Sequence, residues 1–160
     1  MPFLHVGLDH LFAAVPEPWG SGGAHRSDGF AYRQFTGQPD GLPRTEITVG
    51  PAGDAMLRAY RRSLVTLLRH GSRLAIDELL LRPQDGADYA RLLRPFDVQY
   101  VLLTASADVL EARGAARGYR AGFGRWSMAA AAHLPRPYDT TFTSGERGPA
   151  DLAAELSSGW

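Results

Sequence analysis

The feature that most constrains the fold is a set of four short apolar segments separated by helical patterns. The segments cover residues 3–7, 74–77, 98–104 and 138–143. The middle two are near-continuous apolar runs, which are typical of parallel strands buried on both faces. Helical patterns cover residues 54–70, 88–93, 107–117 and 150–156. Strands that alternate with helices predict an α/β fold with right-handed crossovers and a doubly wound parallel sheet.

Two stretches depart from this alternation. Residues 16–29 have the composition of a loop, and residues 30–50 read as two alternating strands around Pro39, Asp40 and Gly41. The second stretch predicts a β-hairpin inserted outside the main sheet. Residues 111–133 carry arginines along a glycine-interrupted helical pattern, which we interpret as an arginine-rich lid.

Size and charge limit the class of protein. The chain has 160 residues, enough for one domain over residues 1–160, and its formal net charge is zero. This balance gives no reason to expect nucleic-acid or membrane partners, and no apolar run approaches the length of a membrane span. We therefore expect a cytoplasmic protein, while no pattern in the sequence indicates its oligomeric state.

Two residue types are absent from the sequence, and their absence excludes several chemistries. There is no cysteine, and all 17 basic residues are arginine. Disulfides, thiolate metal sites, a Schiff-base lysine and a G-x-x-x-x-G-K-[ST] phosphate loop are therefore excluded within these 160 residues. The glycine-rich stretch 20–24 has no following Lys-Ser/Thr pair, and we interpret it as a flexible linker.

Acidic residues follow two of the predicted strands. Asp9 comes after segment 3–7, while Asp77 and Glu78 come at the end of segment 74–77. Ligands of open α/β sheets bind outside the carboxyl ends of the strands, where an acid can accept a proton or hold Mg²⁺ through water. For Asp9 the alternative is a structural role, capping a helix that starts at His10.

The arginines of the predicted lid suit an anionic substrate. Arg113, Arg117, Arg120 and Arg125 recur along the glycine-interrupted segment. Guanidinium groups donate paired hydrogen bonds to phosphoryl oxygens and stabilise the charge of a phosphoryl group in transfer. The alternative is an ordinary solvated helix face. Glycine-rich surroundings favour the mobile lid.

Five stretches together resemble a known family over nearly the whole chain. They are "PFLHVGLDHLFAAVP", "TEITVGPAG", "LLRHGSRLAIDELLL", "FDVQYVLLTASADVLEARGAARGYRAGFGR" and "YDTTFTSGERGPADLAAEL". With these stretches the chain resembles the chloramphenicol phosphotransferase-like family of P-loop kinases. The resemblance implies a three-layer α/β fold, the cofactors ATP and Mg²⁺, and phosphoryl transfer to a hydroxyl group of a small-molecule acceptor.

The resemblance also implies roles for individual residues. Asp9 matches the base that acts on the acceptor hydroxyl, and Arg117 and Arg120 match the arginines that embrace the ATP phosphates. Asp77 and Glu78 match acids on the strand beside the phosphate loop, with Asp77 holding Mg²⁺ through water. The remaining implied contacts are Arg113, Thr143 and Ser144 at the nucleotide, within a loop 143–149 near the adenine, and Phe30, Tyr32 and Phe35 at the acceptor.

One part of the family pattern has no counterpart here. Family members begin with a strand, a phosphate loop with its lysine, and a helix, together about 30 residues. We therefore expect an N-terminally truncated chain that lacks the first, central strand and the Walker A loop, and that is inactive as it stands. Whether the protein is an enzyme stays open. The alternatives are a non-catalytic remnant that binds a small ligand and a toxin-like P-loop kinase with another substrate.

Overall fold

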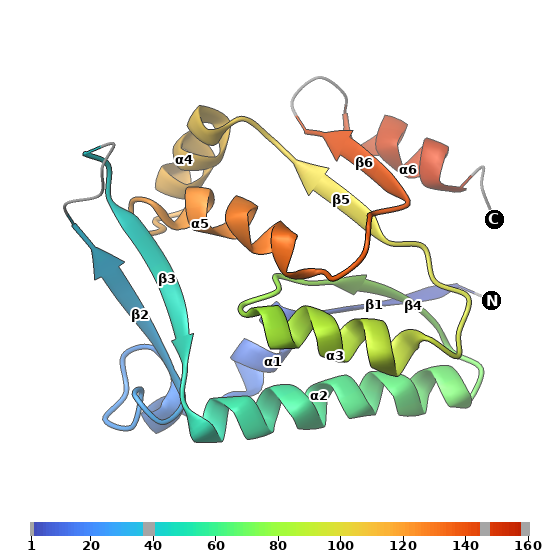
Figure 1. Ribbon diagram of the computed structural model, residues 1–160, viewed down its shortest axis with the longest axis horizontal. Helices are drawn as coiled ribbons and strands as arrows, with labels where there is room; N and C mark the ends of the chain where they lie inside the picture. Colours follow the sequence, from blue (N-terminus) through green and yellow to red (C-terminus); the bar gives the residue numbers. More distant parts are fainter. Residues whose placement is uncertain (1, 37–40, 145–147, 158–160) are drawn as a thin grey trace.

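The computed structural model describes residues 2–36, 41–144 and 148–157, which form an α/β fold (Figure 1). Proline at the first position opens several of the helices, because the missing N–H of proline costs nothing in a first turn. The elements in chain order are β1 (Phe3–Gly7), α1 (Leu8–Ala14), the short 3-10 helix η1 (Glu17–Trp19), β2 (Phe30–Phe35), β3 (Arg44–Val49), α2 (Pro51–Arg69), β4 (Arg73–Asp77), α3 (Pro83–Leu93), β5 (Val101–Thr104), α4 (Ala107–Ala116), α5 (Phe123–Ala130), η2 (Ala131–His133), β6 (Thr140–Thr143) and α6 (Pro149–Ser157).

The strands form three separate pairs. β1 pairs with β4 in parallel, with Gly7 opposite Asp77, and β5 pairs in parallel with β6. β2 and β3 form an antiparallel hairpin. Among the described residues, β4 and β5 are not hydrogen-bonded to each other. The arrowheads of β4, β5 and β6 point toward the side where the hairpin, α4 and α5 lie (Figure 1), so the carboxyl ends of these strands share one side of the molecule.

The expectation that the middle strands are buried on both faces is wrong. Val6, Leu74 and Ile76 pack against Leu64 of α2 and Tyr89 of α3. The opposite face of the β1–β4 pair is exposed, as the alternating burial along β4 shows. Leu103 of β5 is 61% exposed. The apolar run indicated the strands correctly, but helices α2 and α3 cover only one face of the first pair.

Helix α3 begins five residues earlier than the sequence pattern predicts. It starts at Pro83 instead of residue 88, and its first turn carries Asp85, whose side chain is only 2% exposed. A buried aspartate breaks the apolar periodicity on which the prediction depends. The aspartate is tolerated there because it lies against arginine.

A buried ion-pair network joins α2 to α3. The side chain of Arg61 is only 3% exposed, donates to Asp85 and lies 3.1 Å from Asp88. Arg82, just before α3, donates to Asp85 at 2.8 Å and to Asp54 of α2 at 2.7 Å. Each buried charge therefore meets an opposite charge, the condition under which charges persist in an interior.

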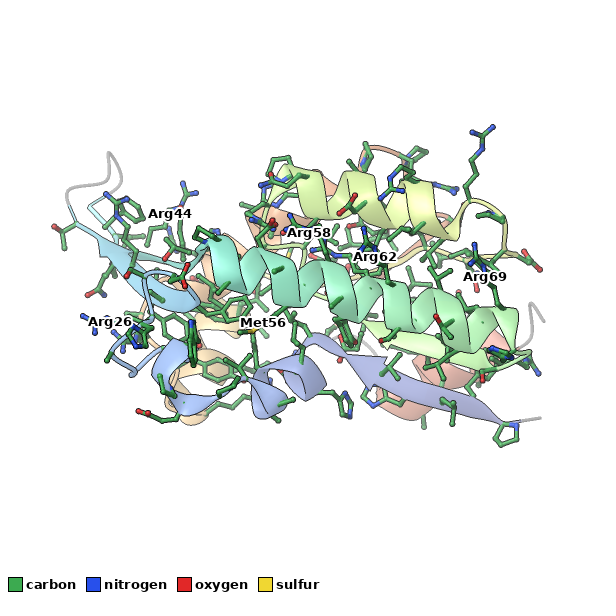
Figure 2. The ribbon with its side chains drawn as sticks, turned by 90° about the horizontal axis from the view of Figure 1, so that it is seen from below. Arg26, Arg44, Met56, Arg58, Arg62 and Arg69 are labelled. Carbon is green, nitrogen blue, oxygen red and sulfur yellow. The ribbon has the colours of Figure 1, made fainter. Side chains whose placement is uncertain are left out.

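The other arginines of α2 lie on its outer side. Arg58, Arg62 and Arg69 follow one another along the helix in Figure 2, and all three are exposed. Their guanidinium groups are therefore solvated, whereas the guanidinium group of Arg61 is buried. Of these four arginines, only Arg61 depends on acidic partners from the neighbouring helix α3.

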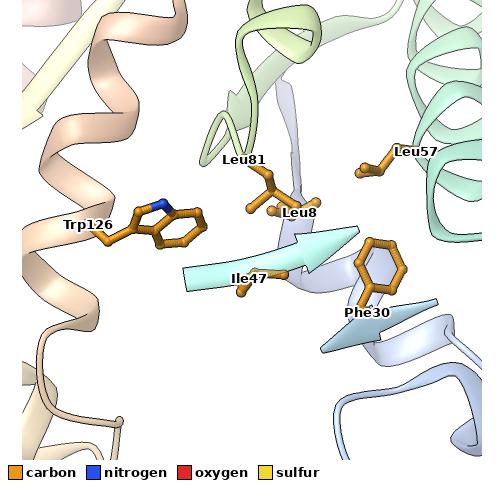
Figure 3. Packing of buried hydrophobic residues seen from close by; sticks show 6 residues of the cluster. All are labelled: Leu8, Phe30, Ile47, Leu57, Leu81 and Trp126. Carbon is orange, nitrogen blue, oxygen red and sulfur yellow. The ribbon is translucent and has the colours of Figure 1, made fainter. Parts of the chain in front are cut away.

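An apolar cluster connects the hairpin to the rest of the chain (Figure 3). Side chains from α1, β2, β3, α2, the segment after β4, and α5 converge in it. They are Leu8, Phe30, Ile47, Leu57, Leu81 and Trp126. The hairpin predicted from the sequence is thus packed against α1 and α5. In the part of the chain that the structure describes, no helix is both long enough and apolar enough to span a membrane.

Substitution of Asp85 tests the ion-pair network. Asp85→Asn keeps the shape of the side chain and leaves Arg61 with a buried, poorly compensated charge. We expect the free energy of unfolding to fall by about 3 kcal/mol, measured by urea denaturation. As a control in the same helix, Arg91→Gln removes the exposed Arg91–Asp88 pair and should cost less than about 1 kcal/mol. Equal effects of the two variants would contradict the network's role.

Candidate functional site

The carboxyl ends of β1 and β4 place two acids at one edge. Asp9 lies exposed in the first turn of α1, and the Asp77 side chain is 81% exposed at the end of β4. The strand register brings these ends together, because Gly7 is opposite Asp77. Helix α1 begins at Leu8 with Gly7 as its N-cap, so the alternative role of Asp9 as the cap of a helix starting at His10 is wrong.

Glu78, next to Asp77, has a different environment. Its Oε1 accepts a 2.5 Å hydrogen bond from the Tyr89 hydroxyl of α3. Burial raises the pKa of Glu78 to about 7, with the negative charges of Asp77 and Asp85 acting in the same direction. The Tyr60 hydroxyl is buried without a hydrogen-bond partner in the described part of the chain. Burial, together with Glu78 and Asp77, raises the pKa of Tyr60 to about 12.

A small aromatic pocket lies between the hairpin and the arginine segment. Its volume is about 90 Å³, and it is lined by Tyr32, Gly118, Tyr119, Arg120 and Phe123. The Phe123 ring stands edge-on to Tyr32 at 5.9 Å and to Tyr119 at 5.5 Å. The Arg120 guanidinium lies over the Tyr32 ring, 5.0 Å from its centroid, a cation–π arrangement.

Electrostatics connect this pocket to Asp9. The pKa of the Tyr32 hydroxyl is raised by burial first, then by Tyr119 and by the negative charge of Asp9, while Arg120 acts in the opposite direction. Phe30, predicted at the acceptor, is only 4% exposed and packs edge-on against Phe12 at 5.0 Å, in the apolar cluster.

The predicted nucleotide residues lie along α4 and at the end of β6. Arg113 Nη1 donates a 2.7 Å hydrogen bond to Ser144 Oγ, and Thr143 is the last residue of β6. Arg117 is exposed at the C-terminus of α4. The predicted adenine loop 143–149 includes residues 145–147, which lie outside the described residues. The structure thus brings Arg113 and Ser144 together, and separately Arg120 and Tyr32.

The sequence interpretation missed two aromatic residues that line the pocket, Tyr119 and Phe123. Both belong to the run "RGYRAGF", in which aromatic residues alternate with arginines of the predicted lid. This alternation is the sequence signal for the two aromatic residues, because guanidinium groups commonly stack on aromatic rings. Arg125, the fourth arginine of the predicted lid, lies in α5, where its amide donates to Glu111 Oε1 at 3.2 Å.

The donors present fit a polyphosphate. Exposed guanidinium groups at Arg117 and Arg120 are the donors that phosphate oxygens prefer. Within the described residues, no three His, Asp or Glu side chains converge as a metal site. The outward carboxylate of Asp77 suits Mg²⁺, which keeps several waters and takes one or two carboxylates in nucleotide sites.

The raised pKa of Glu78 predicts a pH-dependent stability. In the unfolded chain the pKa of Glu78 is near 4.5, so the folded chain holds the Glu78 proton more tightly than the unfolded chain does. Glu78 therefore stabilises the fold fully below that pH, and this contribution is lost as the pH rises toward 7. We expect the Glu78→Gln variant to gain stability over wild type across this window, by up to about 1.4 kcal/mol per pH unit, in urea unfolding measured at several pH values.

The exposed Glu17→Gln variant is the control for the same change of charge. It should follow the wild-type pH curve. If Glu78→Gln also followed that curve, burial of the Glu78 carboxyl would not influence folding.

Comparison with known proteins identifies the family. The family model described as chloramphenicol phosphotransferase-like protein matches residues 1–160, the whole chain. No curated protein matches the chain. The match confirms the resemblance that the five sequence stretches indicate. With a parallel-stranded α/β fold, acids at the carboxyl ends of β1 and β4, and Arg120 lining an aromatic pocket, the chain belongs to the chloramphenicol phosphotransferase-like family.

Proposed function

We propose that the protein transfers a phosphoryl group from ATP to a hydroxyl group of a small molecule. Its family supports a kinase-type phosphotransferase with a small-molecule substrate. The observation that carries the proposal is the placement of Arg120 over Tyr32, 5.0 Å from the ring centroid. This contact joins a side chain of the type that binds phosphate to the aromatic pocket that Arg120 and Tyr32 line.

In the proposed reaction, Asp9 accepts the proton of the acceptor hydroxyl. The hydroxyl oxygen then forms a bond to the γ-phosphorus of ATP, and the bond from that phosphorus to the oxygen of ADP breaks. Arg117 and Arg120 donate hydrogen bonds to the charged phosphoryl oxygens and stabilise the transition state. Bound Mg²⁺ would neutralise charge on the nucleotide phosphates, with Asp77 holding it through water.

We further propose that a parallel strand belongs between β4 and β5 and carries the phosphate loop. Three features support it. β4 pairs with β1 and β5 with β6, yet β4 and β5 do not pair with each other among the described residues. Leu103 of β5 is largely exposed. The buried Tyr60 hydroxyl, near the acids that end β4, has no hydrogen-bond partner among the residues that the structure describes.

This second proposal predicts weak nucleotide binding by residues 1–160 alone. Without loop amides and a lysine, the β- and γ-phosphates lack most of their positioning contacts. We expect a Kd for Mg-ATP above about 1 mM by titration calorimetry. Joining a strand, a G-x-x-x-x-G-K-[ST] loop and a helix to the chain should restore binding. Tight binding by residues 1–160 alone would contradict the proposal.

Substitution of Asp9 tests the transfer reaction in the chain that carries the phosphate-loop segment. Transfer of labelled phosphate from ATP is measured with chloramphenicol, named in the family description, and with simple aromatic alcohols as acceptors. Asp9→Asn removes the proton acceptor, so we expect the rate to fall by about a hundredfold or more while ATP binding persists.

Asp108→Asn is the matched control for Asp9. Asp108 is likewise an exposed acid at the second position of a helix that follows a parallel strand, here α4. It should leave the transfer rate unchanged. Full activity of the Asp9→Asn variant would show that Asp9 is not the base.

A further inference from the structure

We propose that Thr45 and Glu111 are positioning residues of the arginine loop, residues 117–122: Thr45 fastens the loop to the β2–β3 hairpin, and Glu111 fastens it to α4. The loop joins α4 to α5 and carries Arg117 and Arg120. Fastened in this way, the arginines and the aromatic pocket keep one relative arrangement. That the arginines bind phosphoryl groups rests on the proposed function. That the loop is held by Thr45 and Glu111 does not depend on it.

Thr45 contacts the loop directly. It lies on β3 with no exposed surface, and its Oγ1 donates a 2.7 Å hydrogen bond to the carbonyl oxygen of Ala121. Thr48, on the same strand, instead donates to Ala31 of the hairpin itself at 3.1 Å. Of these two threonines, only Thr45 links the hairpin to the arginine loop.

The backbone of the loop lies close against the hairpin at Gly122. This residue has a φ of +80°, in the left-handed region, and a Cβ there would overlap the carbonyl oxygen of Pro43. Glycine is therefore required on two grounds, conformation and space. The contact lies one residue from the Thr45–Ala121 hydrogen bond, so both features fix the same end of the loop.

Glu111 holds this end from the other side. It lies on α4, and its two carboxylate oxygens accept from two different amides, Oε2 from Gly122 at 3.0 Å and Oε1 from Arg125 at 3.2 Å. Both amides belong to the start of α5, where backbone N–H groups lack partners within the helix. A single side chain thereby connects α4, the end of the arginine loop and α5.

The beginning of the loop is also hydrogen-bonded to α4. The amide of Arg117 donates to Arg113 and Gly114, and the amide of Tyr119 donates to Gly114 at 2.8 Å. The loop is thus held at both ends, with Arg120 between them over Tyr32. This arrangement differs from the mobile lid that the glycine-rich sequence favours. Glycines leave the backbone free to move, but three contacts restrict the loop: the Thr45–Ala121 hydrogen bond, the close approach of Gly122 to Pro43, and the hydrogen bonds to Glu111.

Hydrogen exchange followed by NMR tests the fastening in the 160-residue chain, without ATP or acceptor. Thr45→Val keeps the shape of the side chain and removes the hydroxyl. We expect the amides of residues 118–123 to exchange about five- to tenfold faster, while those of α2 keep their wild-type rates. Thr45→Ser should restore the wild-type rates in the loop, and the matched control Thr48→Val should leave them unchanged.

A spectroscopic signature reports on the arginine itself. The Tyr32 ring current should shift the side-chain protons of Arg120 upfield in the wild type, and Thr45→Val should move them toward the values of an unstacked arginine. Glu111→Gln provides a second route, since one amide oxygen replaces two acceptors and the Gly122 or Arg125 amide should exchange faster.

Two results would overturn the inference. One is a Thr45→Val variant in which the loop amides exchange at wild-type rates and the Arg120 side-chain signals stay at their wild-type positions. The other is faster exchange spread over α2 and α3, which would make Thr45 a residue of general stability. If the chain that carries the phosphate-loop segment transferred no phosphate to any acceptor, the proposed function would be contradicted and this measurement would be unaffected.

Discussion

The arrangement of the site depends on one apolar cluster, formed by Leu8, Phe30, Ile47, Leu57, Leu81 and Trp126. Burying each large side chain contributes about 1.5–3 kcal/mol, so the cluster holds α1, the hairpin and α5 together more strongly than any surface contact does. Each part of the site is close in sequence to a member of it. Asp9 follows Leu8, Tyr32 lies two residues after Phe30, and Trp126 is in the helix after the arginine loop. Apolar packing therefore places the charged groups.

The two acids at the end of β4 are neighbours in sequence but lie in different environments. Asp77 ends the strand with its side chain in water, while Glu78 turns toward α3 and accepts a hydrogen bond from Tyr89. Burial raises the pKa of Glu78 to about 7. Asp77 is thus the acid suited to a hydrated cation.

Sequence patterns predicted the local elements better than the contacts between them. Segments 3–7 and 74–77 correspond closely to β1 and β4, because an apolar run bounded by turns depends on nearby residues alone. The start of α3 was missed, since Asp85 is buried only by virtue of an arginine 24 residues away. The role of Thr45 lay beyond any pattern for the same reason. Phe30 and Tyr32 share a face of β2, yet only Tyr32 reaches the pocket, a distinction that depends on where α1 packs.

A formally neutral chain cannot attract a polyphosphate through its net charge, so the phosphate recognition that we propose has to be local. Stabilisation of a phosphoryl group by arginine is effective when the donors are in place before the charge develops, because no free energy is then spent on reorganisation. A loop held by Thr45, Glu111 and the contact at Gly122 meets this condition for Arg120. The stacking of Arg120 on Tyr32 restricts the guanidinium further and partly shields it from water, which strengthens its interaction with an anion. The hairpin thus contributes Tyr32 to the aromatic pocket, which we propose takes the acceptor, and also orients the cation that faces it.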